Sequence, residues 1–282
     1  MTSTNYQINW DSINIGGEDT STSTTYLLRD TIGEIATGVS TSTNYEISAG
    51  YRAGEAVSSY ITFEIGTQEY GAETTWTAFS SSGLTVTVTT SSIYTVGDFI
   101  AVVENVGFGQ LVAIGKVTDV TGSVVTVDAW GGEPSSLSAT PSGGDDYTYR
   151  LGGSAASLGM QSIVTENTSI TVTNVVSNAT NGYTVGVEGQ DALHTTTTTM
   201  HDVEDGAVTA GSEEYGIEAV GTRAVNPGTD MAIPVLSTQA VQQYSSTASN
   251  ERVAVIYKLA VSPSTPTGNY TQTLIYRLTG NF

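Results

Sequence analysis

The sequence contains no cysteine, so disulfide bonds, thiolate metal sites and cysteine nucleophiles are excluded. Basic residues are also scarce: eight Lys and Arg face 28 Asp and Glu, which gives a formal net charge of −20. The acidic excess is spread along the whole chain, and no segment carries the basic patch that contacts phosphates. We therefore expect neither nucleic acid nor an anionic membrane surface as a partner.

Long apolar runs are missing as well. None approaches the roughly 20 residues that a transmembrane helix needs, so we expect no membrane insertion of the mature chain. The first residues, MTSTN, lack the basic region and apolar core of a signal peptide. Two interpretations stay open: a signal was removed ahead of Met1, or Met1 is the initiator of a cytosolic or viral protein. We favour the first.

The residues that favour helices are sparse, and charged residues make up only 13 % of the chain. Polarity comes instead from Thr, Ser, Asn and Gly. Threonine and the β-branched apolar residues fit a pleated, half-buried surface. With 282 residues there is room for two or three modules, each with its own core. The composition predicts an all-β fold divided into residues 1–56, 57–152 and 153–282.

The first segment, residues 1–56, repeats a Ser-Thr-x-Tyr motif three times, at residues 3–8, 23–28 and 42–47. In each copy the tyrosine and the residue two positions later lie on one face, as in a strand with one buried face. The segment is too short, and too rich in Gly, Ser and Thr, to bury a core alone. Its strands must pair with this chain's C-terminal sandwich or with a neighbouring subunit.

Residues 5–15 form the candidate assembly strand. Its apolar pattern changes parity midway, which predicts a β-bulge near Asp11 and Ser12. Donated to a neighbour, this strand would produce head-to-tail polymerisation by strand addition. Kept in its own chain, it would be an ordinary strand, which is the simpler interpretation, and both stay open. The apolar residues of the strand are Tyr6, Ile8, Trp10, Ile13 and Ile15.

In the middle segment, 57–152, short alternating strands with glycine turns between them predict a small β-barrel-like module. The expected strands cover residues 60–65, 84–88, 99–103, 111–117 and 124–127.

In residues 153–282 the pattern predicts a β-sandwich. Alternation is unbroken from Val253 to Val261, with Lys258 on the opposite face. Turns are marked by Asn-Gly and Pro-Thr-Gly-Asn sequences. The expected strands cover residues 169–175, 183–188, 215–220, 232–236, 252–261 and 270–278.

Three regions of the chain resemble known proteins. The N-terminal pattern STNYQI, STTYLL and STNYEI is similar to the start of mature secreted proteins from uncultured, small-genome bacteria. VGDFIAVVEN and IGKVTDVTGSVVTVDAW resemble small barrel modules of surface and tail-fibre proteins. NATNGYTVGVEG and PTGNYTQTLIYRLTGNF resemble immunoglobulin-like C-terminal domains of bacterial surface proteins. These resemblances imply an extracellular or cell-surface location and an immunoglobulin-like sandwich, but no activity.

Metal ligands are few. Two histidines, His194 and His201, fall short of the three or four ligands of a zinc site. Acidic turns at residues 16–19, 143–146 and 202–206 have the acid density of a calcium loop without the EF-hand order. Ordinary turn chemistry explains them sufficiently, so we expect no cofactor and keep calcium as the alternative.

A catalytic site is not indicated. No Gly-x-Ser-x-Gly elbow occurs, and no carboxylate pair stands in an aromatic setting, so we expect no enzyme. Trp10, Trp76 and Trp130 could line a sugar-binding face, although such residues are more often core anchors. The only lysines, Lys116 and Lys258, are too few to indicate intramolecular isopeptide links.

Together these features predict an extracellular structural subunit that polymerises into a pilus-like surface filament or coat, with donor strand complementation by the N-terminal segment. The alternative is a monomeric adhesin that binds a glycan or protein ligand. A viral fibre or decoration protein is the third hypothesis.

Overall fold

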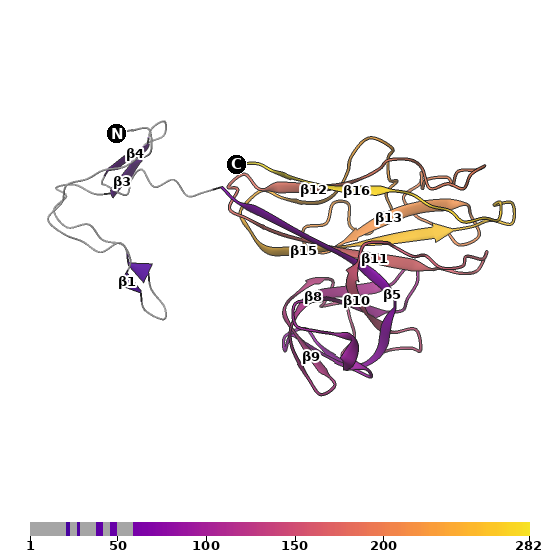
Figure 1. The fold of residues 1–282 in the computed structure, drawn as a ribbon, viewed down its shortest axis with the longest axis horizontal. Helices are drawn as coiled ribbons and strands as arrows, with labels where there is room; N and C mark the ends of the chain where they lie inside the picture. The colour runs from indigo at the N-terminus through magenta and orange to yellow at the C-terminus, as the bar shows by residue number, and fades with distance from the viewer. Residues whose placement is uncertain (1–20, 23–26, 29–37, 42–45, 50–58) are drawn as a thin grey trace, which may run out of the picture. The chain divides into compact units, whose positions relative to one another are not determined.

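The computed structural model describes residues 21–22, 27–28, 38–41, 46–49 and 59–282. It divides the chain into two compact units, Met1–Ser58 and Ser59–Phe282 (Figure 1). The second unit consists of antiparallel strands, connecting loops and one short 3₁₀ turn, η2 (Ser91–Ile93). The prediction of an all-β fold is therefore confirmed. None of the described residues forms a helix long and apolar enough to cross a membrane.

In the first unit the described residues form two short antiparallel pairs. β1 (Ser21–Thr22) pairs with β2 (Leu27–Leu28), and β3 (Gly38–Thr41) pairs with β4 (Glu46–Ala49). β2 and β4 overlap the second and third copies of the Ser-Thr-x-Tyr motif. The candidate assembly strand, with Tyr6, Ile8, Trp10, Ile13 and Ile15, and the acidic turn 16–19 lie outside the described residues.

The β-sandwich of the second unit is built from two sheets, with four strands facing three as in constant-type immunoglobulin domains. The apolar core between the sheets includes Tyr183, Ile217 and Val255. The four-stranded sheet has the order β5 (Ile61–Ser80), β11 (Thr168–Ser177), β15 (Ala248–Ala260), β13 (Glu214–Val220). The three-stranded sheet has the order β14 (Gln239–Tyr244), β12 (Tyr183–Gly189), β16 (Leu274–Gly280).

The second half of β5 enters a closed barrel. Its ring of strands closes because β10 pairs with both β7 and β5. Trp76 lies in its core, and its indole N–H donates to the carbonyl of Val103 at 3.1 Å. The other strands of the ring are, in order, β10 (Tyr147–Gly153), β7 (Phe99–Glu104), β8 (Leu111–Thr121), β9 (Val124–Gly132) and β6 (Thr85–Val88).

β5 belongs to both halves of this unit. Residues 61–67 pair with β11 in the sandwich, residues 67–75 with β10, and residues 76–80 with β6 in the barrel. A single nine-stranded sheet therefore runs from the barrel into the sandwich. At the crossing, a Cβ on Gly66 would stand 2.2 Å from the carbonyl oxygen of Leu151, so only glycine fits there.

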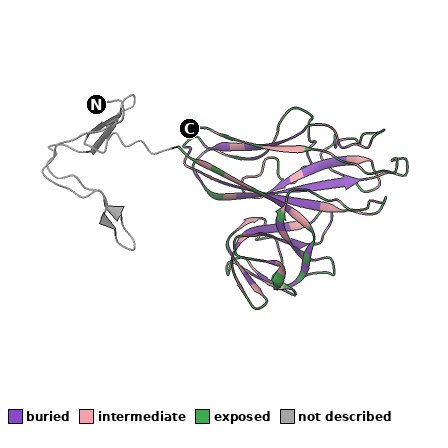
Figure 2. Ribbon diagram, viewed as in Figure 1, coloured by how far each residue is buried: buried purple, intermediate pink, exposed green. Residues whose placement is uncertain are grey.

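β15 is buried on both faces. Val253, Val255 and Tyr257 face the sandwich core, whereas Ala254 and Ile256 pack against a second cluster that includes barrel residues of β7, β8 and β10. Figure 2 shows the resulting purple band along the central sheet. The four-stranded sheet is therefore the middle layer of three.

Some predicted strands differ from the structure. The strand predicted over residues 232–236 is wrong: only isolated bridges at Met231 and Val235 occur there, because Pro234 cannot donate to a ladder. The last strand begins at Leu274 and not at Tyr270. β10 and β14 were not among the predicted strands.

Candidate functional site

The barrel-facing row of β15 carries a cation at each end. Arg252, Ala254, Ile256 and Lys258 alternate along this face, and Arg252 and Lys258 are each only 4 % exposed. A buried charge is costly unless it is paired and hydrogen-bonded. Both cations have carboxylate partners, and they define two polar clusters at the junction of barrel and sandwich.

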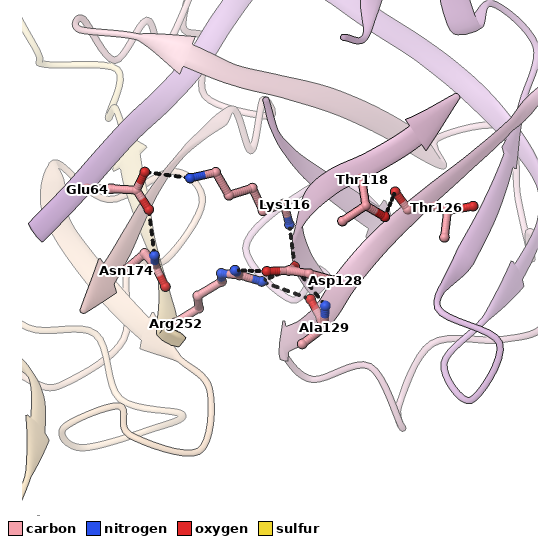
Figure 3. Close-up of polar contacts among 8 residues, drawn as sticks. All are labelled: Glu64, Lys116, Thr118, Thr126, Asp128, Ala129, Asn174 and Arg252. Carbon is pink, nitrogen blue, oxygen red and sulfur yellow. Dashed lines mark hydrogen bonds and ion pairs between the residues drawn. The ribbon is translucent and has the colours of Figure 1, made fainter. Parts of the chain in front are cut away.

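The first cluster is centred on Arg252 (Figure 3). Its guanidinium makes a two-pronged contact with Asp128 of β9, at 2.7 Å to Oδ1 and 2.5 Å to Oδ2. It also donates to the carbonyl oxygen of Ala129 at 3.0 Å, and it lies 5.6 Å from the ring centroid of Phe99. This planar, bidentate geometry is the strongest form of an arginine–carboxylate contact.

Glu64 extends the same cluster across the sheet. Glu64, Asn174 and Arg252 are neighbours in register on β5, β11 and β15. One oxygen of Glu64 accepts from Asn174 Nδ2 at 2.7 Å, and the other lies 2.5 Å from Lys116 Nζ of the barrel (Figure 3). The Arg252 cluster therefore joins three sandwich strands to β8 and β9 of the barrel.

The carboxylates of this cluster titrate below their ordinary range. Burial opposes ionisation of Asp128, but the hydrogen bonds and charge of Arg252 outweigh it and lower the pKa of Asp128. Burial likewise opposes ionisation of Glu64, and hydrogen bonds from Lys116 and Asn174 with the charge of Lys116 lower its pKa. The ionised carboxylates therefore stabilise the folded state.

This stabilisation should disappear in acid. Because the folded-state pKa of Asp128 is depressed, its contribution is complete above the unfolded pKa and is lost as pH falls through the folded value. We expect the gap in unfolding free energy between wild type and Asp128→Asn to shrink between about pH 5 and pH 2. Urea unfolding of both proteins across this range measures it, and a gap that stays constant would contradict the assignment.

The second cluster is a triad around Lys258. Its Nζ lies 2.7 Å from Oε2 of Glu218 on β13 and 2.8 Å from Oδ1 of Asp230 in the following loop. The other oxygen of Asp230, Oδ2, accepts the backbone N–H of Val208 at 2.7 Å. The triad lines a cavity of about 330 Å³, together with Glu133, Gln110 and Phe108.

Apolar residues flank the triad. Val203, Val208, Ala260 and Phe108 form a small cluster next to it. Gly216 is the register partner of Lys258, and a Cβ there would stand 2.6 Å from Val203 Cγ1. Val203 therefore occupies the space beside Lys258 that a side chain at position 216 would fill. Burial and the charge of Glu218 raise the pKa of Glu133, which also lines the cavity.

The predicted metal candidates do not come together. His194 lies 3.7 Å from Asp191, and His201, which is 80 % exposed at its side chain, lies 3.9 Å from Glu213. The part of the chain that the structure describes contains no group of three or more His, Asp or Glu side chains placed to hold a metal ion.

The carboxylates of the acidic turns accept hydrogen bonds from backbone N–H groups. Asp146 accepts the N–H groups of Asn105 and Gly143, each at 2.8 Å, and Asp205 accepts that of Ala207 at 3.1 Å. These contacts are ordinary turn chemistry.

Two of the three tryptophans belong to the barrel. Trp76 is 1 % exposed, and half-buried Trp130 packs on Phe79 with ring centroids 5.1 Å apart. Trp10 lies outside the described residues. Trp76 and Trp130 both pack against Phe79 in the barrel.

No protein-family model, curated protein or solved structure matches the chain. Its class is defined by the fold: an all-β protein in which a β-sandwich and a closed barrel share one sheet, with two ion-paired clusters at their junction.

Proposed function

We propose that the protein is an extracellular, non-enzymatic structural subunit that polymerises into a surface filament or coat. In this proposal, residues 5–15 of one subunit add as a strand to the sandwich of the next. The observation that supports it is a pair of strand edges on one side of the sandwich that have no partner among the described strands. The scarcity of lysine and the Thr/Ser/Asn/Gly composition favour the extracellular location.

One unpaired edge belongs to β16. It pairs with β12 on one side, and none of the described strands pairs with the other. Leu274, Tyr276 and Leu278 are half-buried there and pack against the sandwich core. An edge strand with free backbone groups and apolar side chains is a template for another strand.

The other unpaired edge is the first part of β5. Among the described strands, residues 61–66 pair with β11 alone. Ile61 and Phe63 are half-buried and contact the same sandwich core. The two edges approach each other at one end, since a Cβ on Gly280 would stand 3.2 Å from Ile61 Cδ1. A strand placed at this side would cover apolar surface from both sheets.

The candidate assembly strand has the matching chemistry. Tyr6, Ile8 and Trp10 alternate as a donor strand requires, and glycines follow at positions 16 and 17. Backbone hydrogen bonds would supply affinity, and the alternating apolar side chains would supply register. Because donor strand and acceptor edge are different surfaces, the contact is head-to-tail and does not close on itself.

Deleting residues 1–15 should abolish filaments. We expect the full chain to form fibres visible by electron microscopy, and the deleted chain to remain a folded monomer in sedimentation experiments. The matched control carries Ile8→Asp and Trp10→Asp, which keeps chain length but removes the apolar face. A full chain that stays monomeric at every concentration would overturn the proposal, because its first strand would then be satisfied within its own subunit.

A further inference from the structure

We propose that Lys258 and Asp230 become joined by an intramolecular isopeptide bond, with Glu218 transferring the proton. This inference is independent of polymerisation, since all three residues belong to one subunit. It rests on the geometry of the Lys258 triad and on its apolar surroundings.

The two reacting groups are already in contact. Nζ of Lys258 lies 2.8 Å from Oδ1 of Asp230, yet this buried oxygen has no hydrogen-bond partner of suitable geometry among the described residues. Oδ2 of Asp230 is held by the N–H of Val208 at 2.7 Å. The carboxyl group is therefore fixed on one side and open to the lysine on the other, an arrangement that favours an intramolecular reaction.

The reaction needs an uncharged amine and an uncharged carboxylic acid. Transfer of one proton from the ammonium of Lys258 to the carboxylate of Asp230 converts an ion pair into a neutral amine and a neutral acid. Lys258 is only 4 % exposed and Asp230 8 %, so water has little access to the two reacting groups. A neutral amine is also the nucleophilic form of lysine.

The step balances without a further reagent. Nζ attacks Cγ of Asp230, and the new C–N bond forms while the bond from Cγ to Oδ1 breaks. Glu218, at 2.7 Å from Nζ, accepts a proton from the nitrogen and delivers it to Oδ1, which leaves as water. Oδ2 becomes the amide oxygen, and the N–H of Val208 stabilises the negative charge that develops there.

Asp230 rather than Glu218 is the acceptor because of this N–H. The side chain of Asp230 is 7 % exposed and that of Glu218 17 %, so the aspartyl group is the more protected from water. The bond would tie β15 to the loop between β13 and β14 and close a covalent loop over residues 230–258.

Mass spectrometry of the folded, then acid-denatured, full chain tests the bond. We expect a mass lower than that of the sequence by one water molecule. Trypsin should then release one branched peptide that joins residues 224–252 to residues 253–277, with no cleavage after Lys258. Cleavage after Arg223, Arg252 and Arg277 defines this product. The branched peptide distinguishes the link from dehydration elsewhere, for instance at Asp205-Gly206.

Variants identify the participants. Lys258→Met should show the full mass, whereas Lys116→Met should still lose one water. Glu218→Gln keeps lysine and aspartate in place and should remain uncross-linked, with circular dichroism confirming that it is folded. Asp230→Asn should lose ammonia instead of water. A folded wild-type chain with full mass and a free peptide 253–258 would overturn the proposal, and loss of water in Glu218→Gln would remove Glu218 from the mechanism.

Discussion

Replacing Arg252 with alanine is expected to lower the free energy of unfolding by about 3–5 kcal/mol, because it removes two charge-assisted hydrogen bonds to Asp128, one hydrogen bond to the carbonyl of Ala129 and the packing of a buried side chain. The arginine side chain is 1 % exposed and makes both prongs of the contact with Asp128. The loss includes the packing of its alkyl chain, since a Cβ on Gly131 would already stand 2.8 Å from Arg252 Cβ. Urea unfolding followed by circular dichroism measures the change.

Arg277 supplies the matched control. Its contact with Glu188 is as short, at 2.6 Å, but its side chain is 56 % exposed. Glu188 is only 10 % exposed at its side chain, but it keeps the hydrogen bond from Thr238 at 3.1 Å, and Arg277→Ala removes an exposed side chain, so its cost should be clearly smaller than that of Arg252→Ala. Equal losses of unfolding free energy in Arg252→Ala and Arg277→Ala would show that burial of the arginine side chain does not determine how much the Arg252 cluster stabilises the fold.

The residues of the sandwich core could be predicted from the alternation of apolar residues along the strands alone. Val253, Val255 and Tyr257 alternate on one face of β15, and the structure places them between the two sheets. The opposite face of β15 also carries apolar residues, Ala254 and Ile256. The apolar run from Val253 to Ala260 is therefore nearly continuous, which a search for alternation alone misses. Such a run is typical of a strand that is covered on both faces. That signal would have marked Lys258 as a buried lysine in need of partners.

The partners themselves could not be predicted. Arg252 and Asp128 are 124 residues apart in the chain, and Asn174 and Glu64 are 110 apart. Hydrophobic period specifies which face of a strand is buried but not which strand covers it. β5 shows the same limit: residues 66–75 are mostly polar and include Gly66 and Gly71, yet they remain in one strand with the rest of β5 because β11 and β10 pair with them.

Trp76→Ala is also expected to lower the free energy of unfolding by about 3–5 kcal/mol, because it leaves a large cavity in the barrel core. Trp76 is 1 % exposed, and its ring meets Phe79 edge-on at 6.4 Å between centroids. The variant also removes the indole donor from the carbonyl of Val103. Trp76→Phe is the matched control: it keeps an aromatic ring, loses the hydrogen bond, and should cost less than alanine.

The shape of the Trp76→Ala transition matters as much as its midpoint. β5 belongs to both barrel and sandwich, and β15 packs against both, so the two halves cannot separate without exposing a shared apolar layer. We therefore expect one cooperative transition, displaced to lower urea, in both Trp76→Ala and the sandwich variant Ile217→Ala. Two separate transitions in Trp76→Ala would show that the barrel unfolds alone. The Arg252 cluster would then hold together two independent domains and not one folding unit.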